Sequence, residues 1–393
     1  MIHRDLEAKV LELARKYPAV SITGPRQSGK TTLAKLAFPH HTYLSFENPD
    51  TRALFEADPR SFLALYHERV IFDEAQRVPE LFSYLQEVID SSDEPGRFVL
   101  TGSQNFLLLK AVGQSLAGRV ALFTLLPLSY HELAMSNHTP ETAAQWVFMG
   151  GYPRLFNSRL DPVDFFPEYV ETYLQRDVRD ELGVRSLSSF NTFLKLCALS
   201  CGEMLNISSL ASDCGVDAKT VRGWLSILEA SHIVYLLQPC FSNARKRLIK
   251  TPKLLFLDTG LACSLLGISS VEQLMRSDRY GHLFEAAVVG EAMKRSFAHG
   301  SKPSISFWRD SNKNEIDLIV KRGLTPVRAI EIKFSTTYRP KYFDTLATVA
   351  SKDLQLTADD VAVIYGGETS LATERGHLFS FRDMDGFLEG NVG

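Results

Sequence analysis

The sequence predicts an α/β chain of several domains, the first of which is a parallel sheet that carries a phosphate-binding loop. A length of 393 residues exceeds what one ordinary hydrophobic core organises. Over roughly the first third of the chain, short apolar runs alternate with helical patterns, which is typical of a parallel sheet. Between the first apolar run and the helix that follows it, residues 24–31 spell G-x-x-x-x-G-K-S/T, the pattern of a loop that cradles phosphates.

Composition indicates a globular protein without a membrane-spanning part. Hydrophobic residues make up 45% of the chain and charged residues 23%, which argues against extensive disorder. No apolar stretch of about 18 residues occurs, and the first residues lack the apolar core of a secretory signal. We therefore expect a cytoplasmic protein with no membrane partner. A net charge of -3 leaves any nucleic-acid binding to local basic patches.

The five cysteines are expected to be reduced residues of the core. Their number is odd, no two of them form a C-x-x-C pair, and no paired Cys or His ligands follow at the spacing of a zinc site. Free cysteines of this kind behave as small apolar side chains. They predict neither a disulfide framework nor a zinc site.

The first domain is expected to span residues 1–135 and to contain five strands. Each strand is an apolar run followed by a helical pattern or a polar turn. The predicted strands are Ala19–Thr23, Thr42–Phe46, Arg69–Phe72, Phe98–Thr101 and Ala121–Leu125. The helix after the first strand is expected over residues 31–38.

The loop between the first strand and its helix predicts a nucleoside triphosphate ligand, ATP, with Mg²⁺. Glycines let backbone N–H groups approach the phosphates, Lys30 reaches the β and γ phosphates, and the Thr31 hydroxyl is a ligand for Mg²⁺. A chance glycine loop is the plain alternative. The residues expected to contact the nucleotide are Gly24, Pro25, Arg26, Gln27, Ser28, Gly29, Lys30, Thr31 and Thr32.

Two acidic residues follow the third predicted strand. Asp73 is placed to meet the Mg²⁺ shell, and Glu74 is placed to polarise the water that attacks the γ phosphate. The alternative is that both merely cap the next helix. Because the phosphate loop and this acidic pair come in the expected order after apolar strands, we favour nucleotide binding and hydrolysis.

Two further positions of the first domain are candidates for catalysis. The fourth strand ends in a polar turn where Ser103 or Gln104 could lie beside the γ phosphate as a sensor; an ordinary helix cap is the equal alternative. Arg119 precedes the fifth strand and could reach the γ phosphate of a neighbouring subunit as an arginine finger. A solvated surface arginine is the plain alternative.

Four segments together resemble the prokaryotic AAA-type ATPases that carry a nuclease-fold domain at the C-terminus. They are residues 24–32, Ile-Phe-Asp-Glu-Ala-Gln at 71–76, Leu-Thr-Gly-Ser at 100–103 and Leu-Ala-Gly-Arg at 116–119. The resemblance covers essentially the whole chain. It implies an AAA+-type P-loop sheet over 1–135, a helical lid over 136–200, a winged helix-turn-helix over 201–257 and an α/β restriction-endonuclease-like domain over 258–393. Arg119, if it acts on a neighbouring subunit, makes self-association into a ring, with a homohexamer expected, the natural assembly.

The middle of the chain is expected to be helical and to contact DNA. Arg154 and Arg176 are possible second-sensor residues of the lid, each more often structural. Residues 206–237 predict two short helices around a glycine-bearing turn, followed by a strand, which is typical of a helix-turn-helix. A protein docking surface is the alternative to DNA contact. The cations expected to contact DNA are Lys219 and Arg222 on the second helix and Arg245, Lys246, Arg247 and Lys250 in a hairpin, with Lys253 beyond it.

The last domain contains a constellation that suits metal-assisted hydrolysis of a phosphodiester. Glu285 lies in a predicted helix, Asp317 enters one predicted strand, and Glu331 and Lys333 share a face of the next. This looks like the PD-(D/E)xK nuclease fold, which implies Mg²⁺ at Glu285, Asp317 and Glu331 with Lys333 beside it. Ile316 stands where the family often has proline, which weakens the match. A surface ion pair, or a domain that only binds, is the alternative.

The function that best unites these features is Mg²⁺-dependent ATP hydrolysis coupled to DNA binding. An oligomeric ATPase of this kind would remodel DNA or translocate on it, with branched or damaged DNA as candidate substrates and cleavage left open. One alternative is an ATP-driven regulatory switch that uses the winged helix and the nuclease fold only for binding. Another is an ATP-gated defence nuclease.

Overall fold

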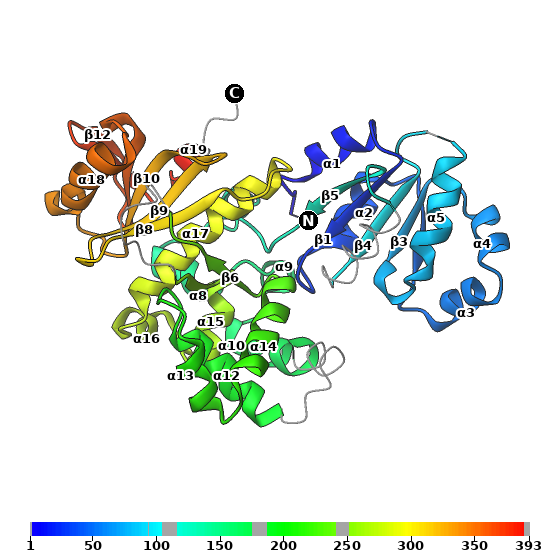
Figure 1. Cartoon of the computed structure of the whole chain (residues 1–393), viewed down its shortest axis with the longest axis horizontal. Helices are drawn as coiled ribbons and strands as arrows, with labels where there is room; N and C mark the ends of the chain where they lie inside the picture. Colours follow the sequence, from blue (N-terminus) through cyan, green and yellow to red (C-terminus); the bar gives the residue numbers. More distant parts are fainter. Residues whose placement is uncertain (1, 93, 104–115, 175–186, 241–250, 389–393) are drawn as a thin grey trace. The chain divides into compact units, whose positions relative to one another are not determined.

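The computed structural model describes residues 2–92, 94–103, 116–174, 187–240 and 251–388. Its contacts divide the chain into two compact units (Figure 1). The first unit is Met1–Leu128 together with the short segments Ala230–His232 and Phe297–Ser301; the rest of the chain forms the second unit. Within the described ranges, no helix combines the length and the apolar character that a membrane crossing requires.

The first unit is built on a five-stranded sheet in the order β2-β3-β4-β1-β5. Every neighbouring pair is parallel, so the predicted parallel α/β sheet is confirmed. The strands are β1 (Ala19–Thr23), β2 (Thr42–Ser45), β3 (Val70–Asp73), β4 (Phe98–Gly102) and β5 (Val120–Thr124). Because all five run the same way, the polar residues at their carboxyl ends lie along one edge of the sheet.

Helices cover both faces of this sheet, and alternate residues of each strand serve the two faces. One face packs against α1 and α2 in a cluster that includes Val10, Leu33 and Ile22. The other packs against α3, α4 and α5 in a cluster rich in phenylalanine, in which Phe46 and Phe72 stack with centroids 5.8 Å apart. The helices are α1 (Glu7–Ala14), α2 (Lys30–Ala37), α3 (Pro49–Ala57), α4 (Pro59–Leu65), α5 (Glu80–Asp90) and the 3₁₀ turn η1 (Ala75–Arg77).

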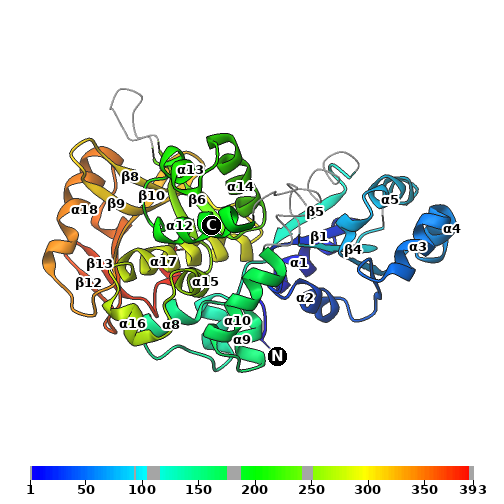
Figure 2. The same cartoon turned by 90° about the horizontal axis from the view of Figure 1, so that it is seen from below.

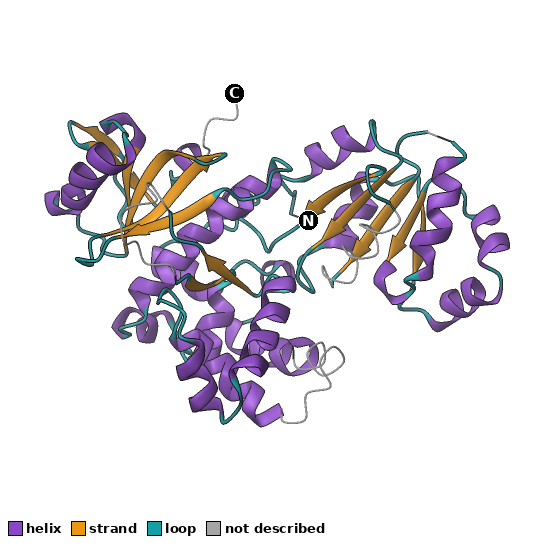
Figure 3. Cartoon of the chain, viewed as in Figure 1, coloured by secondary structure: helices purple, strands orange, loops and turns teal. Residues whose placement is uncertain are grey.

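The second unit begins with a series of helices (Figure 3). Its middle contains α13 and α14, which are separated by Gly215 in a left-handed conformation with φ of 67°. An antiparallel pair, β6 (Val234–Leu237) and β7 (Lys253–Phe256), follows them. The helices are α7 (Tyr130–Met135), α8 (Ala143–Met149), α9 (Pro153–Asn157), α10 (Pro162–Tyr169), the π-helix η2 (Val170–Leu174), α12 (Leu187–Leu199), α13 (Ile207–Cys214), α14 (Ala218–Ala230), α15 (Thr259–Leu265), α16 (Val271–Arg276) and α17 (Tyr280–Ala298).

The second unit ends in a six-stranded mixed sheet in the order β12-β13-β11-β10-β9-β8. Strands β8, β9 and β10 are antiparallel, whereas β11 pairs in parallel with β10 and with β13. Helix α18 packs on one face of this sheet (Figures 1 and 2), where Leu346 and Val349 join Ile319 and Val363 in one cluster. The elements are β8 (Ile305–Arg309), β9 (Glu315–Arg322), β10 (Thr325–Lys333), η3 (Pro340–Phe343), α18 (Asp344–Val349), η4 (Ala350–Leu354), η5 (Ala358–Asp360), β11 (Val361–Tyr365), β12 (Leu371–Thr373), β13 (Gly376–Ser380) and α19 (Asp385–Leu388).

Backbone pairing joins the small β6-β7 sheet to its neighbours in the second unit. Residue Pro239, just after β6, bridges to Phe307 of β8, and the Cys240 N–H donates to the Phe307 carbonyl at 2.6 Å. On the far side of β7, Met204 bridges to Lys253. Strand β7 is therefore held along both of its edges, which fixes the direction in which the Lys253 side chain leaves the backbone.

Candidate functional site

The loop before α2 has the strained backbone of a phosphate cradle. Gly24, Gln27 and Gly29 have φ of 146°, 61° and 96°. A Cβ atom on Gly24 would lie 2.1 Å from the carbonyl oxygen of Leu125, at the end of the adjacent strand. Only glycine fits there, because any other residue would meet both this backbone atom and an unfavourable φ.

A buried arginine of the first unit donates a hydrogen bond to this loop, and the sequence did not indicate it. Arg4 is 7% exposed, and its guanidinium donates to the carbonyls of Ser28 at 2.6 Å and Leu126 at 2.7 Å. No local pattern could indicate this role, since the contact with Leu126 spans 122 positions of the chain. The other predicted contact residues range from buried to exposed: Pro25 and Ser28 are buried, Arg26, Gln27 and Thr31 are half-buried, and Thr32 is exposed.

Lys30 points into the loop rather than into solvent. Its side chain is buried, and Nζ donates to the carbonyls of Gly24 at 3.1 Å and Pro25 at 2.8 Å. The ammonium therefore lies at the centre of the predicted phosphate cradle. A cation in this place suits the charge of a triphosphate.

Asp73, at the end of β3, accepts hydrogen bonds from three hydroxyl groups that lie on three other elements. Thr31 Oγ1 of α2 donates to Oδ1 at 3.0 Å, Thr101 Oγ1 of β4 donates to the same oxygen, and Tyr43 OH of β2 donates to Oδ2 at 2.7 Å. Burial, followed by this hydrogen bond to Asp73, raises the pKa of Tyr43 above its ordinary range. The carboxylate and the Thr31 hydroxyl are oxygen donors of the kind Mg²⁺ prefers, so the donor set fits the ion expected with ATP.

Glu74 is held beside Asp73 by two polar side chains. It has a left-handed backbone with φ of 54°, which is uncommon for a residue other than glycine. Gln76 Nε2 donates to Oε2, and Ser103 Oγ at the end of β4 donates to the same oxygen at 3.2 Å. Of the two sensor candidates, Ser103 thus lies next to Glu74, whereas Gln104 lies outside the described residues.

The predicted arginine finger is paired within its own chain. Arg119 Nε lies 2.5 Å from Oδ1 of Asp90, and Nη2 lies 3.0 Å from Oδ2. This two-point ion pair joins the turn before β5 to the end of α5. Arg154 is exposed on α9, and Arg176 lies outside the described residues.

The predicted DNA contacts can be described only in part. Lys219 and Arg222 are exposed on α14, the second helix of the helix-turn-helix pattern. The turn before this helix is fixed by Asp217, whose carboxylate accepts from the N–H of Thr220 at 2.8 Å. The hairpin cations Arg245, Lys246, Arg247 and Lys250 lie outside the described residues.

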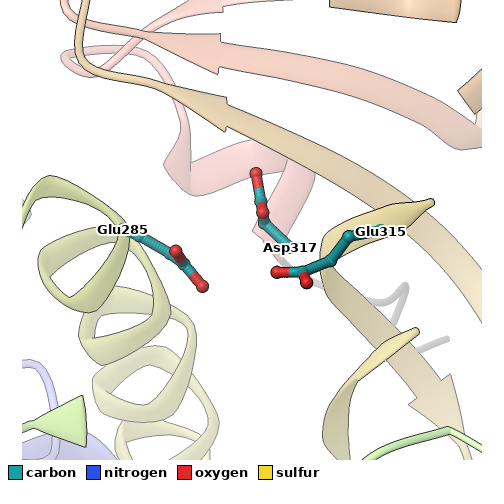
Figure 4. A group of neighbouring side chains, drawn as sticks. All are labelled: Glu285, Glu315 and Asp317. Carbon is teal, nitrogen blue, oxygen red and sulfur yellow. The ribbon is translucent and has the colours of Figure 1, made fainter. Parts of the chain in front are cut away.

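In the second unit, three carboxylates converge from α17 and β9. Oxygens of Glu285, Glu315 and Asp317 all lie within 4.8 Å of one another (Figure 4). Glu315 was missed in the sequence, although its spacing of two from Asp317 places both on one face of a strand. On the neighbouring strand, Lys333 Nζ lies 2.5 Å from Glu331 Oε1 and 3.8 Å from Asp317 Oδ2. The predicted residues Glu285, Asp317, Glu331 and Lys333 are thus brought together.

A buried lysine lies on this cluster. Lys253 of β7 has a side chain 3% exposed; its Nζ lies 2.6 Å from Glu285 Oε1 and also contacts Glu315 Oε1. The prediction that groups Lys253 with the hairpin cations is therefore wrong, because a buried and paired ammonium is no surface contact for DNA. Burial lowers the pKa of Lys253, but Glu285, Asp317 and Glu315 together raise it above its ordinary value, so this lysine stays charged.

The remaining charges of the cluster show an excess of carboxylates. Burial, and then Asp317, raise the pKa of Glu331 to about 8, and burial raises the pKa of Glu285 to about 7. The second oxygen of Glu331 is buried without a hydrogen-bond partner. The donor atoms alone suit a divalent cation. The group of Glu285, Glu315 and Asp317 does not fit one, because an ammonium already contacts two of these three carboxylates.

Most of the chain is similar to known proteins or protein families. Residues 16–134 match a family model described as an AAA domain, and residues 140–272 and 280–384 match two domains of unknown function, DUF8612 and DUF4143. The uncharacterized protein Rv2008c of Mycobacterium tuberculosis is 33% identical over 371 residues, which cover 93% of this chain and 80% of that protein; the uncharacterized protein Mb2031c of Mycobacterium bovis matches equally.

Two proteins match this chain at lower sequence identity. The uncharacterized protein MJ1544 of Methanocaldococcus jannaschii is 24% identical over 353 residues, covering 81% of this chain and 75% of that protein. The Walker-type ATPase PABY2304 of Pyrococcus abyssi aligns with 67% of this chain and 96% of its own, at 15% identity and a TM-score of 0.46. The chain therefore belongs to the family of the two uncharacterized mycobacterial proteins, and its residues 16–134 are an AAA-type P-loop ATPase domain.

Proposed function

We propose that this chain couples Mg²⁺-dependent ATP hydrolysis to the binding and remodelling of DNA, or to translocation on it. The observation that carries the proposal is the convergence of Lys30, Thr31, Asp73 and Glu74 at one end of the parallel sheet. Contacts among them and with β2 and β4 fix their positions. These are residue types that nucleotide hydrolysis uses, and their contacts with one another support the proposal.

Each residue of this end has one role in the proposed reaction. Backbone N–H groups of residues 24–32 bind the phosphates, and Lys30 neutralises the β and γ phosphates. Thr31 and Asp73 would hold Mg²⁺, which supplies charge neutralisation between the phosphates. Glu74 orients and polarises the attacking water, with Ser103 beside it to respond to the γ phosphate.

Self-association into a ring, with a homohexamer as the natural assembly, supplies the last catalytic group. Arg119 would then act on the γ phosphate of a neighbouring subunit. For that, its ion pair with Asp90 must open. The pair is solvent-facing, with side chains 35% and 45% exposed, so its opening costs about 1 kcal/mol or less.

The proposed DNA binding rests on three domains after the ATPase core. They are a helical lid over 136–200, a winged helix over 201–257 and a nuclease-fold domain over 258–393. Support comes from the α13-α14 pair, the glycine turn between the helices and the antiparallel β6-β7 pair after them. Lys219 and Arg222 are exposed on α14 and suit phosphate contacts. The four hairpin cations at 245–250 would extend this surface.

The last domain is proposed to bind DNA without cutting it. The donor set of Glu285, Asp317 and Glu331 with Lys333 favours a second candidate, a metal-dependent and ATP-gated nuclease. Lys253 argues against that candidate, because its ammonium contacts Glu285, one of these donors, and also the neighbouring Glu315. Asp317→Ala distinguishes the two candidates. If the natural chain cleaves DNA with Mg²⁺ and this variant does not, the nuclease is established.

The proposed DNA contact is tested by the salt dependence of binding. Fluorescence anisotropy would follow labelled duplex and four-way-junction DNA over a series of salt concentrations, for the natural chain and for Lys219→Ala and Arg222→Ala. Each substitution should reduce the slope of log K against log salt by roughly 1. Lys16→Ala, which removes an exposed cation of the first unit, is the control. Unchanged slopes in both α14 variants would remove this helix from the interface and favour the regulatory switch.

A further inference from the structure

Lys253 occupies the place in the carboxylate cluster where a metal ion would be expected. Its Nζ is within 2.6 Å of Glu285 Oε1, contacts Glu315 Oε1 and lies 5.4 Å from the centroid of the Phe307 ring. We propose that the ammonium of Lys253 is the resident cation of this cluster and excludes a divalent ion from it. This inference does not depend on whether the chain hydrolyses ATP or binds DNA.

The backbone around Lys253 gives the ammonium little freedom to leave. Lys253 pairs with Leu237 of β6 on one edge and bridges to Met204 on the other. The flanking residues continue this pairing: the Leu254 N–H donates to the Glu203 carbonyl at 3.0 Å. Moving the backbone at this point would break hydrogen bonds on both edges of β7, each costly to leave unmade in a buried place. The backbone of Lys253 is therefore held in place, and its side chain, 3% exposed, keeps the ammonium among the carboxylates that it contacts.

The charges of the cluster explain why one cation is needed here. Among the described residues, the ion pairs of this cluster join four carboxylates, those of Glu285, Glu315, Asp317 and Glu331, to three cations, those of Lys253, Lys333 and Arg309. Arg309 Nη1 lies 3.0 Å from Glu315 Oε2, at the outer side of the cluster. Without Lys253, four carboxylates would share two cations in a largely buried place. Carboxyl oxygens this close to one another are the donors that divalent cations prefer.

The test is Mn²⁺ binding to the nucleotide-free full chain, measured by electron paramagnetic resonance of free Mn²⁺. All proteins carry Asp73→Asn, so that the ATP site does not contribute. The parent should show no saturable site tighter than about 1 mM, the weak end of protein carboxylate sites. Lys253→Met, whose side chain is one atom shorter and carries no charge, should gain one site at least tenfold tighter.

Three further variants test whether the gained Mn²⁺ site depends on Glu285 and on the charge of Lys253. Adding Glu285→Gln to Lys253→Met should abolish the gained site, and Lys253→Arg should show none, because the positive charge is kept. Lys294→Met is the matched control: Lys294 also pairs with a buried carboxylate, Glu291 at 2.8 Å, but that carboxylate is no member of the converging group. It should lose stability without gaining a site.

The parent chain with its natural Lys253 tests the inference even if Lys253→Met folds poorly. If the parent binds Mn²⁺ saturably and Glu285→Gln or Asp317→Asn removes that binding, Lys253 does not exclude a divalent ion and the inference is overturned. If Lys253→Met folds, Mn²⁺ should also raise its melting temperature by several degrees while leaving the parent unchanged. A folded Lys253→Met chain that takes no Mn²⁺ would equally overturn the inference.

Discussion

Gly24→Ala tests whether the backbone of the phosphate-binding loop is as tightly determined as its geometry indicates. An added Cβ would lie 2.1 Å from the Leu125 oxygen, and Leu125 cannot easily retreat, since its N–H donates to the Thr23 carbonyl at 2.8 Å. Overpacking against backbone costs about 1–3 kcal/mol. A φ of 146° in a residue other than glycine adds about 1–3 kcal/mol. The sum is roughly 4 kcal/mol.

The chain offers a matched control in Gly118→Ala. Gly118 also has a positive φ, of 78°, but a Cβ there would meet nothing within 4 Å. Only the backbone term remains, about 1–2 kcal/mol. The two substitutions therefore differ in crowding, while the residue change and the sign of φ are the same.

Hydrogen exchange of β1 peptides, read by mass spectrometry, measures both variants. At 1.4 kcal/mol for each factor of ten, Gly24→Ala should speed exchange on the order of 10³-fold and Gly118→Ala by roughly tenfold. All three tryptophans, Trp146, Trp224 and Trp308, lie in the second unit, so unfolding followed by tryptophan fluorescence should not change. Equal exchange rates in the two variants would refute the steric reasoning.

Three more predictions follow from named contacts. Glu74→Gln should keep nucleotide affinity and lose at least about 100-fold in hydrolysis, as seen by comparing phosphate release with binding of a fluorescent ATP analogue; hydrolysis at the natural rate would exclude Glu74 as the base. Tyr43→Phe removes one donor to Asp73 and should destabilise the first unit by about 1–2 kcal/mol in hydrogen exchange of β3, whereas Tyr17→Phe should not. Burial raises the pKa of four of the five buried thiols, so native protein at pH 8 should react with a disulfide reagent much more slowly than in denaturant, where every thiol returns to its ordinary pKa; rapid native reaction would contradict this. These four are Cys197, Cys201 (to about 12), Cys214 and Cys263.

The first unit could be predicted from the sequence because its central strands β1, β3 and β4 are short apolar runs buried on both faces. Predicted and observed bounds agree at Ala19–Thr23 and differ by one residue at the end of β4. The phosphate loop and the acidic pair could be placed because each follows such a strand directly. No sequence pattern indicates Arg4 or Tyr43, whose roles depend on contacts between segments distant in the chain.

In the second unit, the carboxylate cluster could be predicted in part. Alternation along a strand places Glu331 and Lys333 together, and the same rule applied to Asp317 would have added Glu315. Lys253 could not be recognised, because the sequence presents it as one more cation after a basic hairpin. Its burial is set by the pairing of β7 on both edges, which only the folded chain brings about.

The measurement that bears most directly on the proposed function is the steady-state rate of phosphate release from ATP and Mg²⁺ at fixed salt. It would compare the full chain alone with the chain in single-stranded, duplex and four-way-junction DNA, with Glu74→Gln as the blank. We expect turnover that the blank lacks and that one form of DNA stimulates several-fold. Equal turnover in the blank would show that hydrolysis does not depend on this site, and turnover unaffected by any DNA would contradict the proposed coupling.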